Sequence, residues 1–143
     1  MESRAGTHEQ ALREAIGDFN DRIAAYLADP EEPVHSFWAT EVEFINFEPS
    51  PFPGTYRGHE GVRQWTRDLF ADFTDSRMDV LEVLEEGDRM AVRMSASGSG
   101  RSSGIPVSLE WGCLLTMRDA QCIQAASDIS YERTLERLRA EAS

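Results

Sequence analysis

The chain has 143 residues, which suits one domain of ordinary size, and its hydrophobic and charged fractions of 41% and 28% are those of a globular protein. Its net charge of −12 argues against nucleic acids and anionic membrane surfaces as partners, since both present phosphate groups. Residues 1–15 lack the apolar segment of a signal peptide and no apolar run reaches the length of a membrane span, so we expect a cytoplasmic protein.

The first half of the chain is predicted to be mainly helical. Apolar residues recur every three or four positions between Leu12 and Leu27, and again between Val62 and Phe73, which is the period of an amphipathic helix. Three prolines in residues 49–53 forbid regular structure there and predict a stiff loop. The expected elements are helices over residues 9–27, 33–38 and 58–73, a strand over residues 42–47, and a loop over residues 48–54.

The second half is predicted to be mainly strands joined by short turns, which implies antiparallel pairing. The expected elements are strands over residues 77–84, 90–96, 106–117 and 122–129, a loop or bulged strand end over residues 97–104, and a helix over residues 132–141. This order predicts an α+β fold, in which N-terminal helices cover one face of a curved sheet to form a cone with a mouth. We expect one domain over residues 8–141, with residues 1–7 as a flexible N-terminus.

Three stretches carry a resemblance to a known family. They are Tyr56-Arg57-Gly58-His59-Glu60-Gly61-Val62, Gly87-Asp88-Arg89-Met90-Ala91-Val92, and Gly104-Ile105-Pro106-Val107 leading to Met117-Arg118-Asp119. From about Leu12 to Leu138 the chain resembles the SnoaL-like branch of the nuclear transport factor 2-like superfamily, which implies the cone fold. That family includes polyketide cyclases, steroid isomerases, epoxide hydrolases, dehydratases and members without known catalysis, so the fold does not give the function.

The resemblance implies that the pocket is lined from the helix-covered face of the sheet, and alternate residues of a strand share a face. We therefore expect the pocket to receive Val42, Phe44 and Asn46 from the first strand, Leu109, Trp111, Cys113 and Leu115 from the long strand, and Ala126, Asp128 and Ser130 from the last strand. Asn46 stands where the steroid isomerases place a base and Cys113 where they place an acid, so their mechanism is not supported.

Asp128 is the carboxylate that the strand pattern places inside, and it is the candidate proton-transfer residue. Its neighbours are small or apolar, so its carboxylate would be desolvated, which suits general acid–base catalysis. The resemblance agrees, because SnoaL-like cyclases use an acidic residue late in the last strand. Alternatively, Asp128 has a purely structural role, in which it caps the strand end or pairs with Arg22 or Arg133.

The other candidates also have structural alternatives. Asn46 either takes part in catalysis by orienting a substrate group or holds the proline-rich loop, and Cys113 is either a nucleophile or substrate-orienting residue or a small buried hydrophobe. Tyr26 offers its hydroxyl to the pocket or belongs to the core. The tryptophans, Trp38, Trp65 and Trp111, belong to the core or form the wall of an apolar ligand site.

Two functions fit these residues. The first is a cofactor-free isomerase, cyclase, lyase or hydrolase acting on a small, largely apolar metabolite of polyketide or terpenoid type. The second is a non-catalytic ligand-binding or dimeric interaction module with the same fold. The three histidines are scattered and the sequence lacks HExxH, CxxC and GxSxG motifs, so we expect neither a metal site nor a cofactor.

The cysteines and the outer sheet face give two further expectations. A turn near residues 119–120 pairs Cys122 with Met117, which leaves Cys113 too far along the hairpin for a disulfide bond. The outward set of the last two strands is predicted to be small and apolar, and it would form a homodimer interface, as is usual in the resembling family. That set is Ser108, Glu110, Gly112, Leu114, Thr116, Ile123, Ala125, Ser127 and Ile129.

Overall fold

A computed structural model describes residues 7–47 and 53–142. In chain order the elements are α1 (Thr7–Ala28), β1 (Trp38–Asn46), β2 (Gly54–Arg57), α2 (Gly58–Phe70), β3 (Phe73–Glu86), β4 (Arg89–Gly100), β5 (Pro106–Arg118), β6 (Gln121–Asp128) and α3 (Tyr131–Ala142). Residues 1–6 lie outside the described ranges, so the flexible N-terminus stays a prediction, and most of the predicted loop over residues 48–54 lies outside them as well. Within the described ranges, the helices are too short or too polar to cross a membrane.

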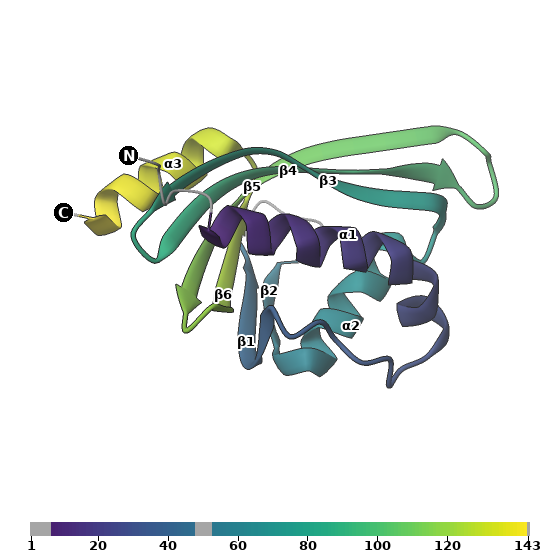
Figure 1. The fold of residues 1–143 in the computed structure, drawn as a ribbon. Helices are drawn as coiled ribbons and strands as arrows, with labels where there is room; N and C mark the ends of the chain where they lie inside the picture. The colour runs from purple at the N-terminus through teal and green to yellow at the C-terminus, as the bar shows by residue number, and fades with distance from the viewer. Residues whose placement is uncertain (1–6, 48–52, 143) are drawn as a thin grey trace.

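The six strands form one curved, open sheet in the order β2-β1-β6-β5-β4-β3 (Figure 1). The β1–β6 pair is parallel and the other pairs are antiparallel. Helices α1 and α2 cover the concave face, and the main core lies between these helices and the sheet. The predicted α+β cone is therefore confirmed.

The structure differs from the sequence prediction in two places and resolves one open alternative. Residues 33–38 do not form a helix, because Ser36 and Phe37 form a turn and Trp38 already begins β1. The short strand β2 was not predicted. Residues 97–100, predicted as a loop or a bulged strand end, match the second alternative, because they extend β4 and pair with β3 on one side, where the register shifts, and with β5 on the other. Tertiary pairing outweighs weak β-propensity in that stretch.

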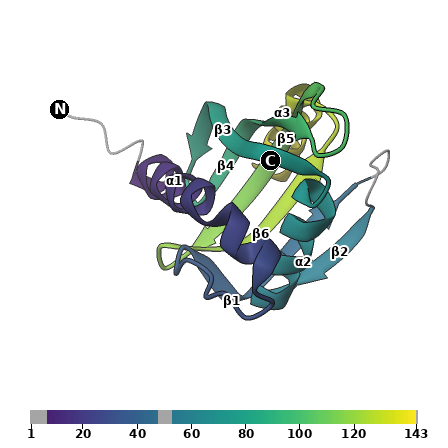
Figure 2. The same cartoon turned by 90° about the vertical axis from the view of Figure 1, so that its right-hand side faces the viewer.

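Helix α3 packs on the convex face of the sheet, opposite α1 (Figure 2). It buries a second apolar cluster that includes Ala91, Leu114, Ala126 and Leu138. Gly112 lets the helix approach closely, since a Cβ atom there would lie 2.2 Å from Thr134 Oγ1 and 2.6 Å from the Ser130 carbonyl oxygen. Part of the surface predicted as a dimer interface is therefore covered by the chain's own C-terminal helix.

A β-bulge in β6 reverses the predicted inside–outside pattern of that strand. Cys122 pairs with Met117 and Gln124 with Thr116, which leaves Ile123 as the extra residue on β6. A single extra residue moves every following side chain to the other face. Ala125 and Ser127 consequently face the concave side, so the predicted outward set is wrong at these positions. Dimerisation itself stays a prediction.

Candidate functional site

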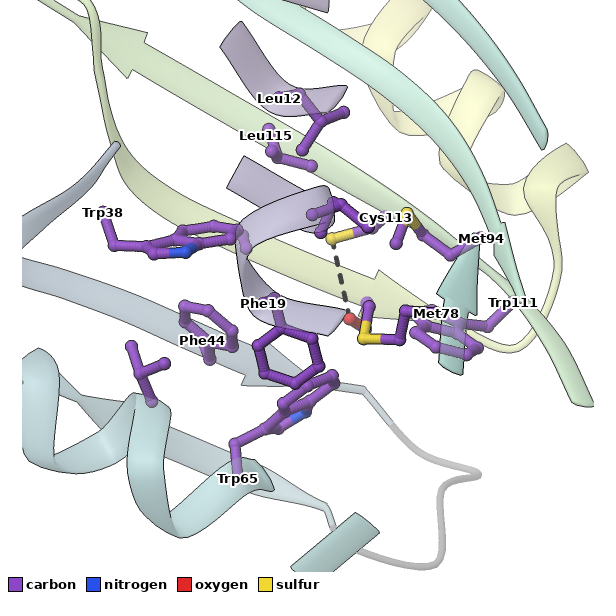
Figure 3. Close-up of a pocket in the computed structure, with 14 residues that line it drawn as sticks. Leu12, Phe19, Trp38, Phe44, Trp65, Met78, Met94, Trp111, Cys113 and Leu115 are labelled. Carbon is purple, nitrogen blue, oxygen red and sulfur yellow. Dashed lines mark hydrogen bonds between the residues drawn. The ribbon is translucent and has the colours of Figure 1, made fainter. Parts of the chain in front are cut away.

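A cavity lies between the concave face of the sheet and helices α1 and α2 (Figure 3). It encloses about 530 Å³ of empty space, counted to include the part open to solvent. Its lining is almost wholly apolar, and the residues are Leu12, Ile16, Phe19, Trp38, Phe44, Val62, Trp65, Met78, Met94, Trp111, Cys113, Leu115, Ala125 and Ser127. A concavity with a mostly apolar lining and few polar groups has the usual make-up of a small-molecule site.

Aromatic rings form a continuous wall along this cavity. The ring centroids of Trp38 and Phe44 lie 5.2 Å apart, those of Phe44 and Trp65 5.6 Å, and those of Trp65 and Trp111 6.5 Å. These spacings are those of edge-to-face and tilted contacts, which stabilise aromatic clusters. The sequence has three tryptophans, and all three line the cavity.

Ser127 and Cys113 give the cavity a polar spot. They are partners across β5 and β6, and the Ser127 hydroxyl donates a hydrogen bond of 3.6 Å to Cys113 Sγ (Figure 3). Burial raises the pKa of the Cys113 thiol to about 12, so it is protonated at neutral pH and is a poor nucleophile. Ser127 has the one hydroxyl group among the described lining residues, and it can both donate and accept a hydrogen bond, whereas the indole N–H groups of the tryptophans only donate.

Six of the residues predicted to line the pocket do line this cavity, and they all come from the aromatic set and β5. These are Trp38, Phe44, Trp65, Trp111, Cys113 and Leu115. Val42 is buried in the core, and Leu109 is not among the lining residues. Asn46 pairs with Ser127 across the parallel β1–β6 ladder and faces the same side, but it is not among the lining residues.

Three other predicted residues do not reach the cavity. Tyr26 is buried in the core, with its hydroxyl 3.4 Å from the Pro33 carbonyl oxygen, and burial raises its pKa. Ala126 faces the α3 side in the second apolar cluster. Ser130 caps α3, because its hydroxyl oxygen accepts a hydrogen bond from the Arg133 backbone N–H at 3.2 Å.

Asp128 also lies on the α3 side, so the prediction that it faces the pocket is wrong. The physical reason is the bulge at Ile123, which the sequence pattern did not reveal. The carboxylate is 1% exposed and accepts a 2.5 Å hydrogen bond from Arg137 Nε, with Arg133 at 3.9 Å. The Arg137 guanidinium in turn lies 3.7 Å from the centroid of the Phe47 ring. The predicted alternative of a structural ion pair matches this geometry, with Arg133 as the more distant partner, but the hydrogen-bonded partner Arg137 was not predicted.

Sequence reasoning missed Ser127, and it missed the part of the wall formed by Phe19 and by the methionines Met78 and Met94. Phe19 was predicted to lie on the apolar face of an amphipathic helix, but the helical period of the apolar residues does not distinguish a core residue from a pocket residue. Met94 lies on the same face of β4 as Val92 and opposite Trp111 in the register, so correct pairing of the strands would have placed it.

Both cysteines are free, as predicted, and both are buried. Burial raises the pKa of Cys122 as well as that of Cys113, so both stay protonated well above neutral pH. Since the thiolate is the reactive form, a rise from the ordinary value to about 12 lowers the reactive fraction of Cys113 on the order of a thousandfold at about pH 8. We expect dithionitrobenzoate to label neither thiol quickly in the native protein and both in concentrated guanidinium chloride. Fast labelling of a thiol in the native protein would contradict this burial.

Comparisons with known proteins agree with this architecture. A family model described as a SnoaL-like domain matches residues 11–125. No curated protein sequence matches the chain. Among solved structures, an NTF2-like protein of unknown function from Burkholderia pseudomallei is 18% identical with a TM-score of 0.64, over 90% of this chain and 95% of that chain.

Two further structures have ligands or functions in their names. A proposed SnoaL-like polyketide cyclase from Jannaschia sp. CCS1 is 17% identical with a TM-score of 0.62, over 94% of this chain and 95% of that chain. TerC, co-crystallised with polyporic acid, is 22% identical with a TM-score of 0.65, over 90% of this chain and 95% of that chain. At such identities the likeness concerns the fold alone.

Proposed function

The chain belongs to the SnoaL-like domain family, and on this premise we propose that it binds a small, flat, largely apolar molecule inside the cone. The observation that carries the proposal is the lining of the cavity, to which all three tryptophans contribute. Flat rings fit between such walls because aromatic contacts add to the gain from burying apolar surface. The hydroxyl of Ser127 would hold one carbonyl or hydroxyl group of the ligand. TerC, which has a similar fold, was co-crystallised with polyporic acid.

The proposal is testable by tryptophan fluorescence, because no tryptophan lies away from the cavity. We would titrate the protein with 2-acetylnaphthalene, a flat apolar ketone whose absorption overlaps tryptophan emission. We expect saturable quenching of most of the emission, with free N-acetyltryptophanamide as the control for inner-filter loss. Quenching that rises linearly without saturation, as in that control, would refute binding in the cavity.

Replacing Ser127 with alanine tests how the ligand is oriented. Loss of one hydrogen bond is expected to weaken 2-acetylnaphthalene binding about threefold to tenfold. Binding of 2-ethylnaphthalene, which has no carbonyl group, should not change. Ser130→Ala is the matched control, because Ser130 caps α3 on the far side of the sheet and should leave both affinities unchanged. If Ser127→Ala weakened both compounds equally, Ser127 would have only a packing role.

Catalysis as an isomerase, cyclase, lyase or hydrolase is the second candidate, favoured by the Ser127 hydroxyl, which could stabilise a developing oxyanion. General acid–base catalysis needs an ionisable group within reach of the substrate. None of the described lining residues is Asp, Glu, His, Lys or Arg, and Cys113 is protonated. We therefore expect the acetyl protons of 2-acetylnaphthalene to exchange with D₂O at the uncatalysed rate, measured by NMR. Faster exchange that Ser127→Ala abolishes would favour the enzyme instead.

A further inference from the structure

A second, smaller apolar cavity lies at the end of the α2 helix, against β4 and β5. It encloses about 230 Å³ of empty space, again including the part open to solvent, and none of its described lining residues is charged. Leu69, Ala96 and Leu109 are three of those residues. Leu109 is 41% exposed, and its neighbours on the same strand face, Val107 and Trp111, are half-buried. We call this cavity the outer groove.

The outer groove continues the inner cavity along the same three elements. On α2, Trp65 lines the inner cavity and Leu69, one turn later, lines the groove. On β5, Trp111 lines the inner cavity and Leu109, two residues earlier, lines the groove.

The neighbouring strand repeats the pattern with Met94 and Ala96, which pair with Trp111 and Leu109 respectively. The two cavities therefore lie end to end on one wall. The rings of Trp65 and Trp111, with centroids 6.5 Å apart, stand at their junction.

The order of chemical groups along this wall is also informative. Moving outward along β5, the side chains that face the concave side are Leu115, Cys113, Trp111 and Leu109. The polar spot at Cys113 and Ser127 thus separates an inner apolar part from the outer groove. A matching molecule has a ring at one end, a carbonyl or hydroxyl group next to it, and an apolar tail at the other end.

We propose that the outer groove holds an apolar tail of the same molecule whose ring binds in the inner cavity, so that the ligand class is an aromatic ring carrying an acyl or similar chain. This inference rests on the proposed function, since the ring must bind first. The tail passes the Trp65–Trp111 pair and covers the exposed part of Leu109. Burying each additional methylene is worth about a fourfold gain in affinity when it is fully removed from water.

The test is a series of 2-acylnaphthalenes from acetyl to hexanoyl, with dissociation constants measured by tryptophan fluorescence. We expect hexanoyl to bind at least about tenfold more tightly than acetyl. Leu109→Glu, at an exposed position, should remove this gain by placing a charge in the groove while leaving acetyl binding unchanged. Ala96→Leu should also remove it by filling the groove. Ser108→Glu is the matched control, because Ser108 is exposed on the opposite face of β5 and the gain should remain.

Each outcome decides the proposal. The proposal is supported if the tighter binding of the hexanoyl compound, relative to the acetyl compound, disappears in Leu109→Glu and Ala96→Leu but persists in Ser108→Glu. If the hexanoyl compound gained the same affinity over the acetyl compound in the unmodified protein and in all three variants, the tail would bind elsewhere. If it gained no affinity in the unmodified protein, the groove would hold no tail. Either result overturns the inference while the function stands, because acetyl binding is measured separately. Failure of 2-acetylnaphthalene to bind would overturn both.

Discussion

Replacing Gly112 with alanine is expected to lower the free energy of unfolding by about 3 kcal/mol or more, the upper end of the usual cost of overpacking. The new methyl group would meet Thr134 Oγ1 at 2.2 Å, the Ser130 carbonyl oxygen at 2.6 Å and Tyr131 Cα at 2.8 Å. Two of these three are backbone atoms at the start of α3, which cannot move without moving the helix. The helix would have to lift from the sheet and expose apolar side chains such as Leu114 and Leu138.

Urea denaturation followed by circular dichroism measures this loss. Gly17→Ala is the matched control, because Gly17 lies within α1 and no atom lies within 4 Å of a Cβ atom built there. Alanine in a helix interior is favoured over glycine, so this control should gain about 0.5–1 kcal/mol. If Gly112→Ala were as stable as the unmodified protein, α3 could not pack on the sheet as closely as described.

Replacing Arg137 with alanine is expected to cost about 2–3 kcal/mol, somewhat less than breaking a fully buried ion pair, because Arg137 is itself 39% exposed. The Asp128 carboxylate, 1% exposed, would be left with Arg133 as its nearest described cation at 3.9 Å. One of its oxygens already has no hydrogen-bond partner among the described residues. The contact between Arg137 and the Phe47 ring would be lost as well.

A double-mutant cycle separates the ion pair from simple loss of packing. Asp128→Ala in the Arg137→Ala background should recover part of the stability, because it removes the stranded charge. Neither change should alter the affinity for 2-acetylnaphthalene, since Asp128 lies on the opposite face of the sheet from the cavity. The structural role of this ion pair would be contradicted if the two substitutions lowered the free energy of unfolding additively. It would also be contradicted if either one lowered the ligand affinity without lowering the stability.

The fold was predictable from the sequence because its main signals are local. The three- to four-residue period of α1 and α2, and the turn residues between the strands, follow from helix and strand geometry. The alternation along β1 and β5 also placed Phe44, Trp111 and Cys113 correctly, because the ladder is regular on that part of each strand. Phe44 and Trp111 are two of the four rings in the aromatic wall.

The last strand was not predictable in the same way. Its bulge at Ile123 depends on pairing with β5 on one side and β1 on the other, and both partners are distant in sequence. Because of this one extra residue, Ser127 faces the cavity in place of the predicted Asp128. Two signals pointed to the correct arrangement: a glycine in the middle of β5, which suggests close approach of another element, and arginines at positions 133 and 137, spaced to share one face of a helix opposite Asp128.

Binding of a flat apolar molecule inside the cone is tested most directly by a crystal structure of the protein with 2-acetylnaphthalene. The naphthalene ring is expected among Trp38, Phe44 and Trp65, with the carbonyl oxygen within hydrogen-bonding distance of Ser127 Oγ. Density for the ring on the convex face, or an inner cavity that stays free of the compound at saturating concentration, would contradict the proposed function.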